Sequence, residues 1–363
     1  MAVSGGSELN AVRTASALRM RGHHVTAFTL TSDTGGMSSR YEAAGIPVRR
    51  FPIDSLVGRR AMHEIKRASA ELADSGVDLV HTHDFYSNLI MVLAARVAGV
   101  PVIASKRWIQ YSHRRHLYTD RLAYRLASRV LVNSREVGES AHREQGVPAH
   151  KLVVIPNFVD AEVFDGAHRR PYWRTHFGFT ANDRVLGVVA QLRPEKNHGL
   201  LLRVFNDLAS NHSDLKLLIV GDGELRAGLE RLVAEYGLSE RVVLAGHVER
   251  AWRTFAAIDV AVLPSQHEGF PNSLIEAMAV GVPIVASDVG GIRDAVRHGK
   301  TGWLVAPGDH SALRDALSCA LRDTVEARQM AALARGEAER LYSQVAVMTR
   351  LESLYHEVCR GEH

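Results

Sequence analysis

Short apolar runs rich in Val, Ile and Leu alternate along the whole chain with longer stretches that mix polar and apolar positions. Runs that are apolar at consecutive positions are typical of parallel strands buried on both faces, and the stretches between them have the length of crossover helices. The predicted strands are 24–30, 77–83, 100–105, 129–134 and 151–157 in the first half, and 184–190, 215–221, 241–246, 259–265 and 283–287 in the second.

Two successive sets of five strands predict an α/β protein with two Rossmann-like, doubly wound domains that face each other across a cleft. We expect the first domain over 1–165 and the second over 166–341, with an irregular linker within 157–173. A last helix over 342–358 has one apolar stripe, and the segment 342–363 is expected to pack back on the first domain. The stripe consists of Val347, Leu351, Leu354 and Val358.

The beginning of the first domain departs from this pattern. Only three residues precede Ser4, Gly5 and Gly6, and a helix is predicted from there to about Arg21. A doubly wound domain normally starts with a buried central strand that leads into such a glycine turn. The first strand is therefore expected to be missing or truncated, and the natural chain to begin upstream.

Composition narrows the cellular setting. The chain has 363 residues, enough for two domains, and only two cysteines, Cys319 and Cys359. A disulfide framework is therefore excluded and a reducing compartment is favoured. The N-terminus lacks a leader pattern, and the longest apolar stretch, 89–104, is interrupted and too short to cross a bilayer. We expect a cytoplasmic protein. Peripheral attachment to the inner face of the plasma membrane is compatible with this expectation.

Charge distinguishes the two halves. Residues 1–160 contain 21 Lys and Arg against 14 Asp and Glu, a net charge of +7, whereas the whole chain carries +4. The segment 106–129 combines many arginines with aromatic residues, which suits an anionic membrane surface or a phosphorylated lipid acceptor. No nucleic-acid module motif accompanies it, so no nucleic-acid partner is expected. The open alternative is a solvated helix on which Leu117, Leu122 and Leu126 pack inward.

Candidate chemistry is densest in "EGFPNSLIE", 268–276, directly after a predicted strand. Pro271 suits a first helical turn and Asn272 and Ser273 suit its cap, so a helix is predicted over 272–280. The free amides of its first turn form an anion site. Glu276, one turn in, can then accept two ribose hydroxyls, while Glu268 faces whatever the phosphate carries. The open alternative is an ordinary first-turn acid and a plain loop.

Two further loops follow strands of the second half. "QLRPEKNHG", 191–199, offers Arg193 and Lys196, cations that would neutralise a diphosphate. "GDGELRAG", 221–228, has glycines, beginning with Gly221, that permit close backbone approach to a ligand. Its spacing departs from G-x-G-x-x-G, which disfavours a dinucleotide dehydrogenase.

These segments together resemble the nucleotide-sugar domain of the family-4 retaining glycosyltransferases, which have the GT-B fold. The resemblance covers about 184–310 and is carried by "QLRPEKNH", "LLIVGDGE", "VVLAGHV", "DVAVLPSQHEGFPNSLIEAMAVGVPIVASDVGG" and "GKTGWLVAPGD". The first half resembles the family more loosely, through "ALRMRGHHV", "DLVHTHD", "GVPVIAS" and "VIPNFVD". The resemblance to this family also implies that the last helix crosses back to the N-terminal domain.

The resemblance also implies residue roles. Glu276 would bind the ribose of a nucleoside diphosphate sugar, and Ser273 would meet the diphosphate with Lys196 as counter-charge. Glu268 would lie near the hydroxyls of the donor sugar. The remaining implied contacts are the amides of Asn272 and Leu274 with the diphosphate, the backbone of Gly269 and Phe270 with the sugar, the turn at His247 and Val248 with the base, and Gly5 and Gly6 with the diphosphate and acceptor.

Three positions depart from the family's pattern. Gln191 stands where an arginine is usual, and we expect Arg193 to replace it. Arg107, or its neighbour Lys106, stands where a histidine is usual after the "PVIAS" strand, and Asp294 replaces a glutamate. Arg107 is expected on the acceptor side together with Asp84 of "HTHD", in which a structural role is expected for His81.

The sequence thus predicts a retaining glycosyltransferase that moves a sugar from a UDP- or GDP-sugar to an acceptor hydroxyl, with Glu268, Lys196 and Arg193 as catalytic residues. The expected acceptor is lipid-linked or an oligosaccharide, in the synthesis of cell-surface polysaccharide or glycolipid. No metal and no other cofactor is expected, although Asp222 and Glu224 imitate an acidic metal pair. Two alternatives stay open: a GT-B nucleotide-sugar 2-epimerase, and an inactive sugar-nucleotide-binding subunit.

Overall fold

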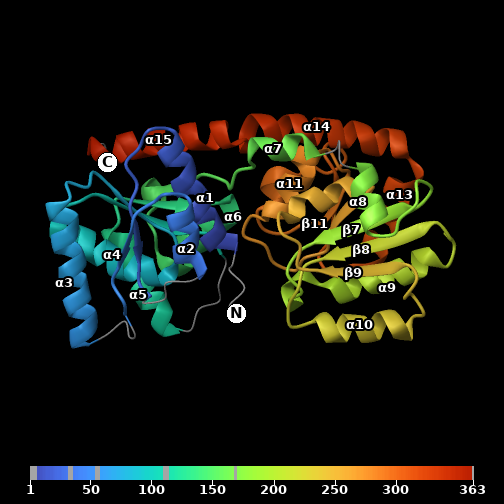
Figure 1. Ribbon diagram of the computed structural model, residues 1–363, viewed down its shortest axis with the longest axis horizontal. Coiled ribbons are helices and arrows are strands. Elements are labelled where there is room, and N and C mark those ends of the chain that lie inside the picture. Colours follow the sequence, from blue (N-terminus) through green and yellow to red (C-terminus); the bar gives the residue numbers. More distant parts are fainter. Residues whose placement is uncertain (1–5, 32–35, 54–57, 109–113, 167–169, 362–363) are drawn as a thin grey trace. The chain divides into compact units, whose positions relative to one another are not determined.

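The structure is a computed structural model that describes residues 6–31, 36–53, 58–108, 114–166 and 170–361. The chain divides into two compact units (Figure 1). Unit 1 comprises Met1–Asn157 and Val345–His363, and unit 2 comprises Phe158–Gln344. The chain therefore leaves unit 1 eight residues before the predicted boundary at 165.

Unit 2 contains one six-stranded parallel sheet in the order β12-β11-β10-β7-β8-β9. β7 and β10 lie side by side in its centre, and the chain moves outward from them in opposite directions. Ligands of doubly wound sheets bind at the carboxyl edge of this switch point. The strands are β7 (Arg184–Val189), β8 (Leu215–Val220), β9 (Val242–Gly246), β10 (Val260–Leu263), β11 (Ile284–Ser287) and β12 (Trp303–Val305).

Helices cover both faces of this sheet (Figure 1). α9, α10 and α13 share one apolar core with it, and α11 and the second half of α14 share the other. Neighbouring residues of β7 point to opposite faces of the sheet: Val185 belongs to one core and Leu186 to the other. Because both faces are buried, consecutive positions of the strand are apolar. The helices are α7 (Ala161–Phe164), α8 (Arg170–His176), α9 (His198–Ala209), α10 (Arg226–Glu235), α11 (Asn272–Val280), α12 (Ile292–Ala295), α13 (His310–Arg322) and α14 (Thr324–Tyr342).

Unit 2 differs from its predicted elements in two places. The segment 157–173 is not wholly irregular, because α7 lies within it and α8 begins in it. β12 is a sixth strand that was not predicted, and it has only three residues. The segment 157–173 also pairs with the end of unit 2, because the Val159 amide donates to the carbonyl oxygen of Tyr342 at 2.7 Å.

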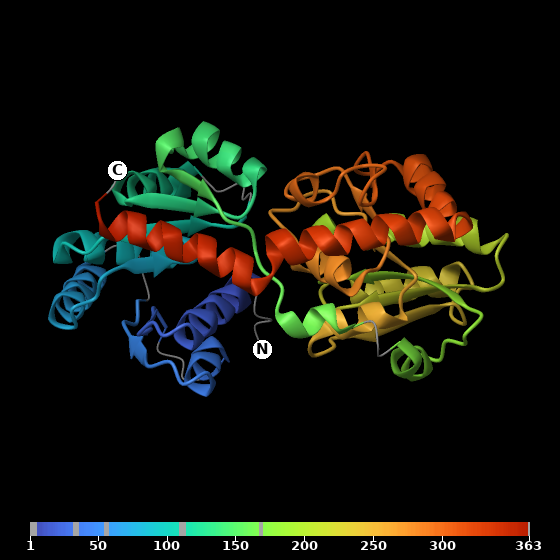
Figure 2. The same cartoon turned by 90° about the horizontal axis from the view of Figure 1, so that it is seen from above.

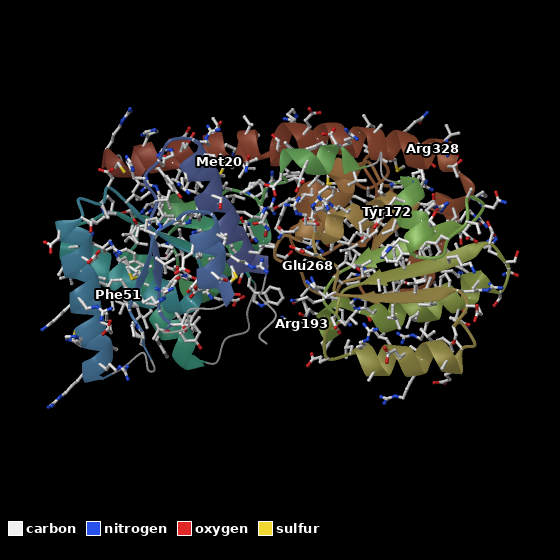
Figure 3. All side chains as sticks on the ribbon, viewed as in Figure 1. Met20, Phe51, Tyr172, Arg193, Glu268 and Arg328 are labelled. Carbon is white, nitrogen blue, oxygen red and sulfur yellow. The ribbon has the colours of Figure 1, made fainter. Side chains whose placement is uncertain are left out.

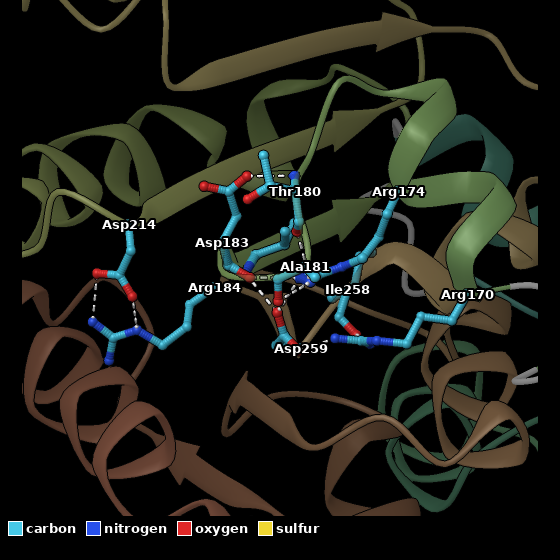
Figure 4. Close-up of polar contacts among 10 residues, drawn as sticks. Arg170, Arg174, Thr180, Ala181, Asp183, Arg184, Asp214, Ile258 and Asp259 are labelled. Carbon is cyan, nitrogen blue, oxygen red and sulfur yellow. Dashed lines mark hydrogen bonds and ion pairs between the residues drawn. The ribbon is translucent and has the colours of Figure 1, made fainter.

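An ionic network fixes the amino ends of the central strands (Figure 4). Arg174 of α8 donates to Asp259, before β10, at 2.7 Å, and Arg170 pairs with the same carboxylate. Arg184 at the start of β7 pairs with Asp214 before β8 at 2.6 Å. These groups lie at the strand ends away from the switch-point loops, so their role is to hold the scaffold.

Unit 1 contains two separate parallel sheets among the described residues. A four-stranded sheet has the order β3-β4-β5-β6, and β1 pairs with β2, a strand that was not predicted. The expected missing central strand stays a prediction. The strands are β1 (Ala27–Thr29), β2 (Val48–Arg50), β3 (Val80–Thr82), β4 (Val102–Lys106), β5 (Arg129–Val132) and β6 (Leu152–Val154).

The C-terminal helix α15 belongs to unit 1 and lies beside its four-stranded sheet (Figure 2). All four residues of the predicted apolar stripe are buried. Arg129 pairs with Glu357 at 2.6 Å and Arg21 pairs with Glu352 at 2.7 Å, which adds ionic contacts at its edges. The helices of this unit are α1 (Gly6–Met20), α2 (Gly36–Ala43), α3 (Arg59–Asp74), α4 (Phe85–Ala98), α5 (Arg114–Leu126), α6 (Arg135–Gln145) and α15 (Gln344–Cys359).

Candidate functional site

Two loops of unit 2 meet at the carboxyl edge of the switch point. The loop after β7 carries Arg193 and Lys196, and the loop after β10 carries Glu268. The Gln266 amide donates to the carbonyl oxygen of Glu195 at 2.8 Å, so the two loops are joined directly. Glu268 and Arg193 accordingly lie at the same edge of the unit (Figure 3).

Lys196 and Glu268 form a buried ion pair at this edge. The Lys196 Nζ donates to Glu268 Oε1 at 2.6 Å, and the Ser265 hydroxyl donates to the same oxygen at 2.7 Å. The side chains are only 16% and 5% exposed. Burying two charges costs desolvation energy that such a pair rarely recovers in stability, so a buried pair in a ligand-binding edge indicates function. Among the described residues, no donor bonds to Oε2 of this glutamate.

Two glycines hold the backbone of the Glu268 loop in place. The Gly291 amide donates to the carbonyl oxygen of Gly269 at 2.9 Å. A Cβ at Gly290 would lie 1.8 Å from the Glu268 carbonyl oxygen, and one at Gly291 would lie 2.2 Å from that of Gly269. Only glycine permits this approach. The sequence analysis did not identify this supporting role of Gly290 and Gly291.

Phe270 anchors the other side of the same loop. Its ring is buried and packs edge-on against Tyr342, with ring centroids 5.4 Å apart. The Tyr342 hydroxyl donates to the carbonyl oxygen of Asp294 at 3.3 Å. The side chain of Phe270 therefore serves packing, and only the backbone of Gly269 and Phe270 remains available for the predicted sugar contact.

The helix after this loop, α11, has the predicted bounds. Pro271 is the N-cap residue with φ −75°, and no side-chain cap bond forms there among the described residues. The predicted cap at Asn272 and Ser273 is therefore wrong, because both are already helical. The Leu274 amide donates to the Pro271 carbonyl oxygen at 3.3 Å, so the first two amides are the better anion donors. Glu276 lies one turn further and is half-buried.

The glycines after β8 have a packing role that the sequence did not predict. Gly221 and Gly223 have φ values of +138° and +158°, and a Cβ on them would meet the carbonyl oxygens of Ala190 and Leu192 at 1.9 and 2.6 Å. They allow close packing against the loop after β7, and the ligand approach suggested by the sequence stays a prediction. This packing positions the loop that carries Lys196.

Sequence reasoning also missed His198, the first residue of α9. Its side chain is fully buried, and neither ring nitrogen has a hydrogen-bond partner among the described residues. Burial, reinforced by the nearby Lys196 ammonium, lowers the pKa of His198 to about 4. The imidazole is therefore neutral near the ion pair. A histidine two residues after the lysine, at the start of an apolar helix, was the available signal.

The other predicted donor-side residues are placed as follows. Arg193 is exposed, and its guanidinium makes no ion pair with a described residue. Val248 is half-buried against the α11 core. Gly6 begins α1, and Gly5 lies outside the described residues. Asp222 accepts from the Gly223 amide at 2.8 Å, and no group of three His, Cys, Asp or Glu suited to a metal occurs in the described part of the chain.

In unit 1, Asp84 and Arg107 follow neighbouring strands. Asp84 is the N-cap of α4 and accepts from the Ser87 amide at 2.8 Å, so its side chain has a structural task. Arg107 follows β4 and donates to Asn157 Oδ1 at 2.8 Å. His81 contacts the hydroxyls of Tyr355 and Ser105 at 2.6 and 2.7 Å, which is a structural arrangement.

The alternative interpretation of the basic helix α5 was that Leu117, Leu122 and Leu126 all pack inward, and the structure differs at one of them. Leu122 is 47% exposed and Tyr118 is 68% exposed, whereas Leu117 and Leu126 are half-buried. Leu122 therefore does not pack inward. None of the helices among the described residues is long and apolar enough to span a membrane.

Comparison with known proteins assigns families to both parts of the chain. Residues 170–336 match the family described as Glycosyl transferases group 1, and residues 4–163 match Glycosyltransferase Family 4. Together the two matches span most of the chain and contain every candidate residue named above for the donor side and the acceptor side.

Among relatives, a phosphatidyl-myo-inositol mannosyltransferase of Mycobacterium leprae is 29% identical, with 98% of this chain and 94% of the relative covered. An N-acetyl-alpha-D-glucosaminyl L-malate synthase of Bacillus anthracis is 27% identical over 59% of this chain, which spans 56% of that relative's length. Anabaena HepE, solved in complex with UDP, has a TM-score of 0.87 at 23% identity, with 98% of both chains covered. This likeness confirms the predicted GT-B fold.

Proposed function

Because the chain belongs to the family-4 glycosyltransferases, we propose that it transfers a sugar from a nucleoside diphosphate sugar to an acceptor hydroxyl with retention at the anomeric carbon. The observation that carries this proposal is the Lys196–Glu268 pair beside the amino end of α11 at the switch point of unit 2. A UDP-sugar is the preferred donor, since Anabaena HepE was solved with UDP; a GDP-sugar is the alternative.

The diphosphate is proposed to bind at the amino end of α11. The first amides of that helix and the Ser273 hydroxyl supply hydrogen bonds, and Lys196 and Arg193 supply positive charge. These groups would stabilise the leaving diphosphate, and losing one such donor typically costs about 3–4 kcal/mol of barrier. With two cations available, the reaction is proposed to need no metal. Glu276 would accept hydrogen bonds from the ribose.

Glu268 is proposed to hold the donor sugar. Its Oε1 is fixed by Lys196 and Ser265. Its Oε2 has no donor among the described residues and can accept from a sugar hydroxyl near the reacting carbon. Glu268 would also couple the two parts of the donor, because its Oε1 is bonded to Lys196, the cation proposed to neutralise the diphosphate.

The acceptor is proposed to be lipid-linked or an oligosaccharide, in cell-surface glycan or glycolipid synthesis. The Mycobacterium leprae relative is named for a phospholipid acceptor. On α5, Tyr118 and Leu122 are exposed and lie one turn apart. Arg121 and Arg125 of the same helix are also exposed. An apolar and cationic face of this kind suits docking on an anionic membrane at the cytoplasmic side.

Titration calorimetry with UDP and GDP, followed by product analysis with UDP-sugars, tests the proposal. We expect UDP to bind in excess EDTA and its affinity to fall at least about tenfold in Glu276→Gln, which loses charge-assisted hydrogen bonds. The exposed Glu235 provides the matched control Glu235→Gln. Absence of nucleotide binding, or strict Mg²⁺ dependence, would contradict it. The M. leprae relative is named a transferase, which disfavours the epimerase and inactive-subunit alternatives.

A further inference from the structure

A second cluster of polar side chains lies at the carboxyl ends of β3 and β4 in unit 1. It contains one histidine within β3 and one directly after it, an arginine after β4 and a tyrosine from α15. The ring centroids of His81 and His83 are 4.2 Å apart, and Tyr355 stands edge-on to His81 at 5.7 Å. The carboxyl ends of neighbouring parallel strands are where doubly wound sheets bind ligands.

Arg107 is the only charged member of this cluster that the structure describes. Burial lowers the pKa of Arg107 to about 10, so it stays charged at neutral pH. Its guanidinium donates to Asn157 Oδ1 at 2.8 Å, and its Nε is inaccessible to solvent and lacks a partner among the described residues. No carboxylate of a described residue pairs with it. Arg107 is half-buried, and withdrawing a cation from water without an anion is costly.

The two imidazoles add hydrogen-bonding capacity without charge. Burial first, and Arg107 second, lowers the pKa of His81 to about 3. The pKa of His83 is also held well below its usual value, by burial and then by His81 and Arg107. Both rings are therefore neutral at physiological pH. His81 uses both nitrogens internally, whereas His83 Nδ1 is buried without a partner among the described residues.

The cluster is also held rigidly. Asn157 Oδ1 accepts from the Asn10 side chain of α1 as well as from Arg107. Asn133 donates to the carbonyl oxygen of Arg107 at 3.1 Å, which fixes the backbone. The chain of contacts from Tyr355 through His81 to Ser105 orients the rings. Such preorganisation reduces the entropic cost of binding an anion.

We propose that Arg107 and His83 form a subsite of unit 1 that binds a phosphate group carried by the acceptor. A guanidinium fork matches a phosphate in bidentate geometry, and the unpartnered imidazole can bond to another of its oxygens. The inference rests on the proposed transferase function only in assigning the phosphate to the acceptor; the binding site itself is independent of unit 2.

Titration calorimetry of the full chain tests the subsite, with three probes: inorganic phosphate, glycerol 3-phosphate, and glycerol as the neutral control. UDP is held at saturation so that the diphosphate site is filled, and the titrations are repeated without UDP. We expect both phosphates to bind, glycerol not to bind, and Arg107→Gln to weaken phosphate binding at least about tenfold, the usual loss for a charge-assisted hydrogen bond. The exposed Arg59 of α3 provides the matched control Arg59→Gln, which should bind as the wild type does.

Two further measurements keep the outcome unambiguous. UDP affinity should be unchanged in Arg107→Gln; lost UDP affinity with intact phosphate binding would assign this arginine to the donor and overturn the proposal. Equal phosphate binding by Arg107→Gln and wild type, no binding by wild type, or binding of inorganic phosphate alone would also overturn it. Tyr355→Phe, which removes a contact of His81 and leaves Arg107 intact, should weaken phosphate binding less than Arg107→Gln does. Failure of UDP binding alone would instead reject the proposed donor site.

Discussion

Each unit holds a half-buried cation, but the two cations have different partners. In unit 2, Lys196 has a carboxylate partner 2.6 Å away, and a serine completes the arrangement. In unit 1, Arg107 has only neutral partners among the described residues. A cation that already has a counter-ion can be shared with a diphosphate at little cost, whereas an unpaired one is stabilised only when an anion arrives. The difference fits the proposed donor site, whose cation has its counter-ion in the free protein, and the proposed acceptor subsite, whose cation would gain one from its ligand.

The largest expected effect comes from removing the counter-ion in unit 2. Glu268→Gln keeps the volume but removes the charge that fixes Lys196 and orients the sugar, so turnover should fall by at least about 100-fold. UDP affinity should change little, because the lysine remains. Release of UDP from a UDP-sugar measures the rate, and Glu235→Gln is the control. Full activity in Glu268→Gln would show that the carboxylate partner of Lys196 is not needed for transfer, and would contradict the proposed difference between Lys196 and Arg107.

The next effect concerns the backbone that supports Glu268. In Gly291→Ala the new Cβ must displace the loop, because it would lie 2.2 Å from the Gly269 carbonyl oxygen. We expect a stability loss of about 1–3 kcal/mol from overpacking, with a larger fall in kcat than in UDP affinity.

The matched control is Gly336→Ala in α14, where a Cβ meets open space. That change should stabilise the protein by about 0.5–1 kcal/mol through helix propensity. Thermal melting and UDP release separate the two effects. If both alanine variants behave alike, the glycine pair does not support the site.

A smaller effect is expected from the buried imidazole of unit 2. The unfolded chain protonates His198 as the pH falls through about 6.5, whereas the folded chain does so only near pH 4. Stability should therefore be lost as the pH falls from about 6.5 to 4, by at most about 3 kcal/mol from this group.

His198→Gln should show a shallower loss over this window, while the exposed His150→Gln should follow the wild type. Urea unfolding at several pH values gives the slopes. Because His81 and His83 of unit 1 titrate low for the same reason, part of the pH dependence should persist in His198→Gln. A wild-type slope in His198→Gln would disprove the burial argument for unit 2.

The smallest effect belongs to the ionic contacts of α15. The Arg21 guanidinium, followed by His23, lowers the pKa of Glu352 to about 2. Its contribution is therefore present above pH 4.5 and lost as the pH falls toward 2. Since the pair lies near solvent, Glu352→Gln should cost under about 1 kcal/mol at neutral pH, and less in high salt. Urea unfolding beside Glu339→Gln checks this; a large, salt-independent loss would contradict it.

Local patterns in the sequence were sufficient for much of the fold. All ten predicted strands exist. An apolar run between turns is a local pattern of adjacent residues, and this pattern is enough to predict a buried parallel strand. The bounds of α11 follow from Pro271 and from the glycine that ends it, Gly281 with φ +83°. The short strands β2 and β12 were missed.

The sequence by itself also determined which residues offer charge at the switch point, among them Lys196 and Glu268. Only the tertiary structure decided that these two form one buried pair, although 72 residues separate them. It likewise decided that Gly221 packs on a neighbouring loop, that His198 is buried near the pair, and that Arg107 lacks a carboxylate partner among the described residues. Periodicity and turn chemistry act between sequence neighbours, whereas burial and charge pairing depend on which distant segments the fold brings together.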